Sequence, residues 1–122
     1  MTASILTVDD SASIRLTTKI ALSNAGYTVT EAVDGADGLA KAKAGRFDII
    51  VTDLNMPNMN GLTMIEELRK LPAHMGVPII FLTTESDAAL KSQAKAAGAT
   101  GWLTKPFDPE TLVKIVRKVL GR

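Results

Sequence analysis

Polar residues that could do chemistry follow four of the five short apolar runs in this 122-residue chain. Asp9 and Asp10 follow the first run, Asp53 follows the third, Thr83 closes the fourth, and Lys105 follows the fifth. If these runs are parallel strands of one α/β sheet, their carboxyl ends share an edge, which is where ligands bind in open α/β sheets. Carboxylates, hydroxyls and an ammonium group at one edge would suit a divalent cation and a phosphoryl group.

The three aspartates are the first candidates for a metal site. Carboxylates that meet at one edge disfavour one another's ionisation, and a cation among them removes that cost. Oxygen ligands favour magnesium or manganese over zinc. An alternative is that Asp9 and Asp10 only cap the following helix. The position of Asp53 after another expected central strand favours the metal site, and the backbone carbonyl of Asn55 is a further possible ligand.

Three of these residues could handle a phosphoryl group. A carboxylate beside a metal, such as Asp53, can act as a nucleophile toward phosphorus. Lys105 could pair with a phosphoryl oxygen and Thr83 could donate a hydrogen bond to another. Taken singly, a lysine after a strand is usually solvated, and threonines are common in strands. Only their expected shared location argues for a site.

The apolar runs alternate with segments of helical periodicity. Strands are expected at residues 4–8, 27–32, 48–52, 78–83 and 100–104. Helices are expected at residues 13–25, 36–44, 62–71 and 87–97, and from residue 109 to a stop at residue 121. Five βα units imply a parallel sheet, right-handed crossovers and helices on both faces. The first, third and fourth strands read as buried on both faces, and the second reads as an edge strand.

Composition narrows the classes of function. The net charge is +1, which does not favour nucleic acid or an anionic membrane, and the chain has no cysteine. No run approaches the ~20 apolar residues of a membrane helix, and no signal peptide is evident. We therefore expect residues 1–122 to form one domain of a cytoplasmic, monomeric protein. His74, the only histidine, is expected in a surface loop with no role, and methionines such as Met64 and Met75 are expected to pack.

The sequence resembles the response-regulator receiver domains of the stand-alone, CheY-like type over essentially its whole length. This resemblance implies a flavodoxin-like, doubly wound five-stranded sheet in the order 2-1-3-4-5 with five helices. The segments that carry the resemblance are Val8-Asp9-Asp10-Ser11, Val51-Thr52-Asp53-Leu54-Asn55-Met56-Pro57, Gly61, Thr83-Thr84-Glu85, Gly98-Ala99-Thr100-Gly101 and Lys105-Pro106-Phe107.

The resemblance also implies roles for the acidic residues. Asp53 would accept a phosphoryl group from a histidine kinase or its phosphotransfer domain. Asp10, Asp53 and the Asn55 carbonyl would hold Mg²⁺ directly, or Mn²⁺ in its place, and Asp9 would act mainly through water. Asn55, together with Thr84 and Glu85, would tune the rate of autodephosphorylation.

Further residues would transmit the signal. By resemblance, Thr83 and Lys105 would hold the phosphoryl group, and Trp102 takes the position of the family's switch aromatic, which is usually Tyr or Phe. A lysine-rich surface near it would meet an acidic partner, although a solvated face is the simpler interpretation. The lysines concerned are Lys91, Lys95, Lys114 and Lys118.

The resemblance favours a phosphorylation-activated signalling module of a two-component system, of the chemotaxis type, whose output is a protein contact, for example with a flagellar motor switch. It would be no enzyme beyond its own phosphotransfer and autodephosphorylation. A phosphate sink or relay receiver remains open. A magnesium-dependent phosphatase with an aspartate nucleophile is disfavoured, because such enzymes carry a second aspartate where Asn55 stands. A flavodoxin-like electron carrier is disfavoured because Asp9 and Asp10 would repel a flavin phosphate.

Overall fold

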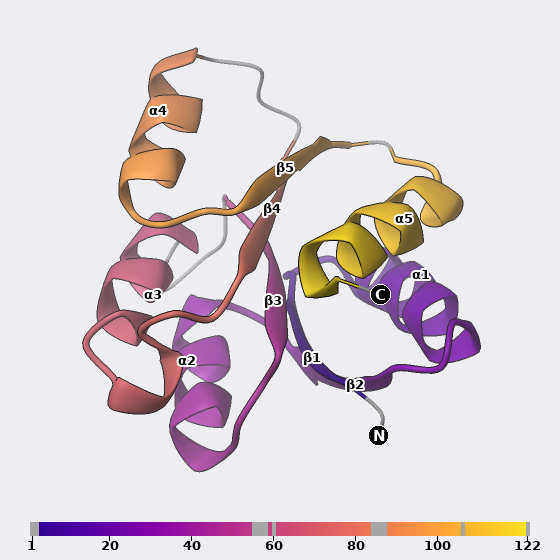
Figure 1. Ribbon diagram of the computed structural model, residues 1–122, viewed down its shortest axis with the longest axis horizontal. Helices are drawn as coiled ribbons and strands as arrows, with labels where there is room; N and C mark the ends of the chain where they lie inside the picture. The colour runs from indigo at the N-terminus through magenta and orange to yellow at the C-terminus, as the bar shows by residue number, and fades with distance from the viewer. Residues whose placement is uncertain (1–2, 55–58, 60, 84–87, 106, 122) are drawn as a thin grey trace.

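The computed structural model describes residues 3–54, 59, 61–83, 88–105 and 107–121. Five strands alternate with five helices and one short 3₁₀ helix (Figure 1). The strands are β1 (Ser4–Val8), β2 (Thr28–Ala32), β3 (Ile49–Asp53), β4 (Ile79–Thr83) and β5 (Gly101–Thr104). The helices are α1 (Ala12–Asn24), α2 (Gly35–Ala44), α3 (Gly61–Leu68), the 3₁₀ helix η1 (Pro72–His74), α4 (Ala88–Ala96) and α5 (Pro109–Leu120).

The sheet has the expected topology. All strand pairs are parallel and the order is β2-β1-β3-β4-β5, so the predicted fold class is confirmed. β3 and β4 are buried along their whole length, as their continuous apolar runs predict. β2 lies at one edge, as its alternating pattern predicts, and β5 forms the other edge.

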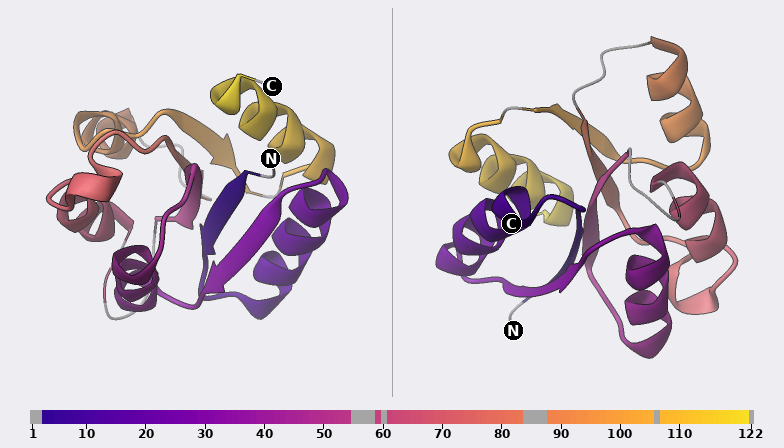
Figure 2. Two further views of the ribbon diagram at one scale, coloured as in Figure 1. Left: turned by 60° about the horizontal axis from the view of Figure 1, so that its bottom comes forward. Right: turned by 180° about the vertical axis from the view of Figure 1, so that it is seen from behind.

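Helices cover both faces of the sheet. Figures 1 and 2 show α1 and α5 side by side on one face, and α2, α3 and α4 on the other. Each face has its own apolar core. One core includes Leu22 of α1 and Leu112 of α5 with β-strand residues such as Val51, and the other includes Ile65 of α3 and Phe81 of β4. Among the described residues, none of the helices is both long and apolar enough to cross a bilayer.

The third helix ends earlier than its pattern predicts. α3 ends at Leu68 instead of residue 71, and the 3₁₀ helix η1 follows. The physical reason is Pro72, since a residue before proline avoids the helical conformation. Leu71 is accordingly extended, with φ −88° and ψ 124°. The helix therefore unwinds before it reaches the proline.

Two predictions about exposure were wrong. His74 is not a surface residue: it is 1% exposed, its Nε2 lies 2.7 Å from the carbonyl oxygen of Ala42, and its ring stacks on Phe47. Burial of this polar ring is tolerated because the end of α2 supplies hydrogen-bond acceptors. Met64 packs in the core as predicted, but Met75 is 64% exposed because it follows η1 at the surface.

Candidate functional site

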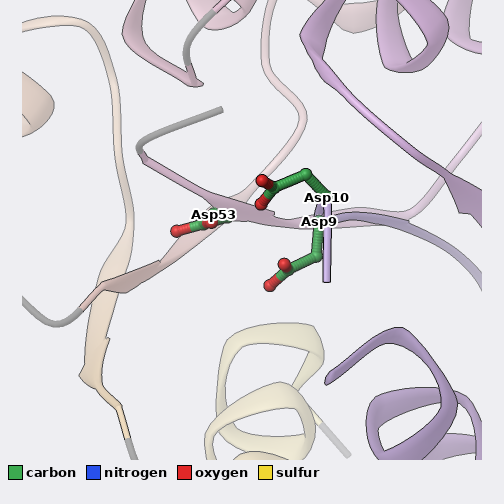
Figure 3. A group of neighbouring side chains, drawn as sticks. All are labelled: Asp9, Asp10 and Asp53. Carbon is green, nitrogen blue, oxygen red and sulfur yellow. The ribbon is translucent and has the colours of Figure 1, made fainter. Parts of the chain in front are cut away.

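Three carboxylates meet where the carboxyl ends of β1 and β3 lie side by side. Val8 pairs with Thr52, so the residues that follow these positions, Asp9 and Asp53, come to the same edge of the sheet. One carboxylate oxygen each of Asp9, Asp10 and Asp53 lie within 4.8 Å of one another (Figure 3). Asp9 and Asp53 are buried, whereas Asp10 is exposed to solvent.

The loop after β1 is held by backbone and side-chain hydrogen bonds. The Ser11 amide donates to Oδ1 of Asp9 at 2.9 Å, and the Ser11 hydroxyl in turn caps α1 by accepting from the Ile14 amide. Nη1 of Arg15 donates to the carbonyl oxygen of Asp9 at 2.7 Å. These contacts hold the backbone that carries Asp9 and Asp10, so the exposed Asp10 carboxylate is presented beside the two buried ones.

Asp53 is set by local contacts at the end of β3. It is 8% exposed and therefore buried. Its Oδ1 accepts a hydrogen bond from the Leu54 amide at 2.8 Å, and the Thr52 hydroxyl donates to its carbonyl oxygen at 2.9 Å. A side chain at Gly61 would place its Cβ 2.4 Å from that same carbonyl oxygen. Glycine is therefore needed at this position for the chain to pass behind Asp53.

Lys105 links the two buried aspartates. Its Nζ lies 2.8 Å from Oδ2 of Asp9 and 3.4 Å from Oδ2 of Asp53. The Lys105 amide donates to the carbonyl oxygen of Thr83 at 2.7 Å, so the ends of β4 and β5 are tied together. Thr83 is fully buried at the end of β4. The structure thus brings Asp9, Asp53 and Lys105 into direct contact, with Thr83 bonded to the Lys105 backbone.

The electrostatics of this cluster are unbalanced. Burial raises the pKa of Asp53 above its ordinary 3.8, and the charge of Asp9 raises that pKa further. Lys105 and the Leu54 amide oppose the increase in pKa, but they do not cancel it. Three carboxylates and one ammonium group leave excess negative charge, and oxygen is the ligand type that Mg²⁺ prefers. The residues present therefore fit a hard divalent cation, with Asp9, Asp10 and Asp53 as the side chains that would hold it.

Several predicted site residues lie outside the described part of the chain. These are Asn55, Thr84 and Glu85, along with the side chain of Lys91. The structure does describe the other residues of the predicted partner surface, which are Trp102, Lys95, Lys114 and Lys118. Trp102 is half-buried on β5, and its ring lies 5.9 Å from that of Phe81.

The three described lysines are exposed, but they lie near different grooves. Lys95 lies beside Trp102 at a groove between α4 and β5, whereas Lys114 lies at a groove between α1 and α5. Lys118 is on α5, one turn after Lys114.

Sequence reasoning missed Arg15. Its position gives a usable signal, since it lies four residues after the N-cap Ser11. Side chains in a helix lean toward its N-terminus, so an arginine one turn into α1 can reach back to the strand end. The precise acceptor, the Asp9 carbonyl, depends on how the loop turns and is not readable from the pattern.

Comparison with known proteins decides the family. Residues 5–117 match the family model for the response regulator receiver domain. The chain belongs to this family. It is therefore a phosphoacceptor switch and a phosphorylation-activated signalling module of two-component systems, as the resemblance implied. Receiver domains bind Mg²⁺ at an acidic site and interact with histidine kinases and downstream targets.

Individual relatives cover the whole receiver domain. The protein PilH of Pseudomonas aeruginosa is 36% identical over 119 residues, which are 98% of this chain and 98% of PilH. The chemotaxis protein CheY4 of Vibrio cholerae has a similar structure, with 47% identity, a TM-score of 0.94, and coverage of 98% of this chain and 99% of CheY4. The receiver domain of the sensor histidine kinase PA1611 from P. aeruginosa, solved with a magnesium ion in its active-site cleft, has 29% identity, a TM-score of 0.91 and full coverage of both chains.

The chain also spans about half of two longer transcriptional regulators, 48% of one and 49% of the other. Receivers of this family therefore occur both alone and as parts of larger proteins.

Proposed function

We propose that Asp53 is the phosphoryl acceptor of this receiver domain. The observation that carries the proposal is its environment: a buried carboxylate at the end of a central strand, clustered with Asp9 and Asp10, and 3.4 Å from the Lys105 ammonium group. No serine or histidine among the described residues has a comparable setting, and His74 is engaged with the end of α2. The likeness to the chemotaxis protein CheY4 supports a signalling role.

In this proposal the two oxygens of Asp53 have different tasks. Oδ1 accepts the hydrogen bond from the Leu54 amide, which orients the carboxylate, and Oδ2 faces Lys105. In the proposed transfer, Oδ2 attacks the phosphorus of a kinase phosphohistidine. An O–P bond forms, the P–N bond breaks, and its electron pair returns to the imidazole nitrogen. Lys105 then pairs with a phosphoryl oxygen, and the Thr83 hydroxyl donates to another.

Magnesium is the proposed cofactor, and Mn²⁺ would serve in its place. Asp10 and Asp53 would hold it directly with the Asn55 carbonyl, which lies outside the described residues, and Asp9 would act mainly through water. The ion would offset the negative charge of the carboxylates and of the transferring group. The exposure of Asp10 supports this ranking, because Asp9 is already paired with Lys105.

The proposed output is a protein contact. A histidine kinase or its phosphotransfer domain would supply the phosphoryl group, and a downstream protein would read the face formed by α4, β5 and α5. The likeness to CheY4 supports a chemotaxis-type pathway, with a flagellar motor switch as the proposed target. A phosphate sink or relay receiver is the alternative.

Several expectations from the sequence stay predictions. They are one domain over residues 1–122, a monomeric state, a cytoplasmic location and the absence of nucleic-acid and membrane partners. Tuning of autodephosphorylation by Asn55, Thr84 and Glu85 also stays a prediction.

The direct test is chemical labelling. The protein is incubated with Mg²⁺ and acetyl phosphate, the acyl phosphate is reduced with borohydride, and peptides are mapped by mass spectrometry. We expect label on Asp53 alone, and none in Asp53→Asn or in a sample with EDTA. Label on His74 or on a serine, with Asp53 unmodified, would rule out the assignment.

A further inference from the structure

One arginine, at the edge of the sheet where the strands begin and thus opposite the aspartates, joins three separate segments. Arg69 follows α3 directly, and its backbone amide still bonds to the Ile65 carbonyl. Its Nη1 donates to the carbonyl oxygens of His74 at 2.9 Å and Val77 at 2.8 Å, and its Nη2 donates to the carbonyl oxygen of Gly98 at 2.8 Å. All three acceptors belong to the backbone. The planar guanidinium group therefore donates to backbone carbonyls of two connections, the one before β4 and the one before β5.

Two of these carbonyls, those of Val77 and Gly98, belong to the connections that lead into β4 and β5. Val77 leads into β4, which ends at Thr83, and Gly98 leads from α4 into β5, which ends just before Lys105. Thr83 and Lys105 are the two residues proposed to hold the phosphoryl group. Arg69 thus ties together the starting points of the two strands whose opposite ends form half of the candidate site.

The fit between Arg69 and Gly98 is close. Gly98 has φ +105°, a conformation that side-chain-bearing residues rarely adopt. A Cβ at this position would also lie 2.8 Å from Nε of Arg69. Burial lowers the pKa of Arg69, so the guanidinium is held in a partly desolvated position over this turn. Glycine is required here both for the turn and for the approach of the arginine.

The described side chains of α4 bury little apolar area. Among its described side chains, residues 92–96, only Ala94 is buried. Burial of a methyl group contributes little, because hydrophobic stabilisation scales with buried area. In Figures 1 and 2, α4 lies at the end of its layer, next to α3. The hydrogen bond from Arg69 to Gly98 therefore adds a restraint just after the carboxyl end of α4, beside the packing of Ala94 and Ala97.

We infer that Arg69 is a positioning residue that pins the carboxyl end of α4 and the start of β5 to α3, so that displacement of α4 on phosphorylation occurs at its amino end. The displacement of α4 on phosphorylation rests on the proposed function, whereas the restraint by Arg69 does not. Lysine cannot replace the arginine fully, since a single ammonium group does not reproduce a planar fork that serves three carbonyls.

Amide hydrogen exchange of the untreated protein tests whether Arg69 restrains the carboxyl end of α4 and the start of β5. In Arg69→Ala we expect amides of residues 94–102 to exchange about tenfold faster, while those of α1 and α2 change less than about twofold. Arg69→Lys should fall between Arg69→Ala and the wild type. The matched control is Lys70→Ala, since Lys70 is the exposed neighbour that pairs only with Glu67 among the described residues. Unchanged exchange in residues 94–102, or a uniform increase over the whole chain, would contradict the proposed restraint by Arg69.

A second pair of variants tests the contact itself. Gly98→Ala places a methyl group against the arginine side chain, so its effect should depend on Arg69. We expect the increase in exchange of the double variant Arg69→Ala, Gly98→Ala to be smaller than the product of the two single increases. A fully multiplicative result would show that the two residues act independently, and it would contradict the inference.

Beryllofluoride with Mg²⁺ tests the displacement. In the wild type, the treatment should change exchange at the amino end of α4 and leave residues 94–98 protected. In Arg69→Ala the change should spread to residues 94–98, while labelling of Asp53 by acetyl phosphate stays within about twofold of the wild type, because Arg69 lies far from the acceptor. A response in residues 94–98 of the wild type would overturn this part. If the wild type shows neither labelling nor a response, the proposed function fails, and the restraint by Arg69 is still judged by the untreated protein.

Discussion

At the scale of single residues, the site is organised around an excess of negative charge. Asp9 and Asp53 are both buried, and Lys105 is shared between them at 2.8 Å and 3.4 Å. One ammonium group cannot neutralise two carboxylates, and the exposed Asp10 adds a third. Without a cation the site therefore carries uncompensated negative charge, which favours the binding of a metal ion; the ion would in turn offset the charge of the proposed phosphoryl group.

This uncompensated charge predicts that Asp53→Asn stabilises the metal-free protein. The pKa of Asp53 is raised in the folded state, so the folded protein binds this proton more tightly than the unfolded chain does. Stability from protonation of Asp53 is therefore present below its ordinary 3.8 and is lost as the pH rises through the raised pKa. At pH 7 with EDTA, the variant should be more stable than the wild type, because asparagine removes a buried charge and its repulsion with Asp9. Urea denaturation at several pH values measures the difference.

The difference between the two proteins should shrink as the pH falls below 3.8, where Asp53 is protonated in both states. Added Mg²⁺ should raise the stability of the wild type more than that of the variant. A variant that is less stable than the wild type at pH 7 would show that the Lys105 ion pair outweighs burial and the repulsion from Asp9.

A second residue-scale prediction concerns the two neighbouring aspartates. We expect Asp10→Ala to weaken Mg²⁺ binding by about 100-fold and Asp9→Ala by about tenfold, since a direct ligand costs more than an outer one. The structure gives a reason for this order: Asp10 is free to face solvent, whereas Asp9 is bonded to Ser11 and Lys105. Calorimetric titration of Mg²⁺ into both variants measures the ranking. Equal losses would mean that Asp9 also contacts the ion directly.

At the scale of elements, the position of Asp53 depends on how closely α3 approaches the end of β3. The amide of Gly61, the first residue of α3, donates to the Leu54 carbonyl at 2.9 Å. A Cβ at Gly61 would meet the Asp53 carbonyl oxygen at 2.4 Å and Phe81 at 3.0 Å. Backbone cannot retreat as a flexible side chain can, so the helix or the strand end must shift.

We therefore predict that Gly61→Ala destabilises the fold by roughly 1–3 kcal/mol, the usual cost of overpacking, and slows labelling of Asp53 by acetyl phosphate. Gly76→Ala is the matched control, because a Cβ at Gly76 has no atom within 4 Å and the residue does not need a positive φ. Urea denaturation and the labelling rate measure the two effects. Similar behaviour of the two alanine variants would show that the close approach at Gly61 relaxes without cost.

Elements with a continuous or strictly periodic pattern are the part that sequence predicts well. Apolar runs locate the ends of β3 and β4 to within one residue, and this alone brings Asp53 and Thr83 to the correct edge. The burial of His74 could not be predicted from such a pattern, because it depends on the end of α2, some 30 residues earlier in the chain. The contacts of Arg15 and Arg69 could not be predicted for a related reason. Their long side chains bond to backbone carbonyls, and the tertiary structure, not the sequence pattern, determines which carbonyls these are.

At the scale of the whole molecule, a change at the aspartates must reach a distant face to become a signal. β4 and β5 provide the connection, since Phe81 pairs with Trp102 and Thr83 pairs with Thr104 in the ladder. Residues two apart on a strand point to the same face of the sheet. Phe81, Thr83 and Trp102 therefore share the face that α3 and α4 cover, and Trp102 is half-buried there. A movement of Thr83 toward a phosphoryl group would alter the space beside these rings.

We predict that Trp102 reports this change through its fluorescence. It is the only tryptophan in the chain, so the emission has one source. Beryllofluoride with Mg²⁺ should shift the emission maximum of the wild type, because the ring changes its contact with Phe81, which lies 5.9 Å away between ring centres. Asp53→Asn should abolish the shift, and Thr83→Ala should reduce it while leaving the fold intact. Fully modified protein with unchanged emission, and with partner binding still switched on, would mean that the signal reaches the α4, β5 and α5 face without passing through Trp102.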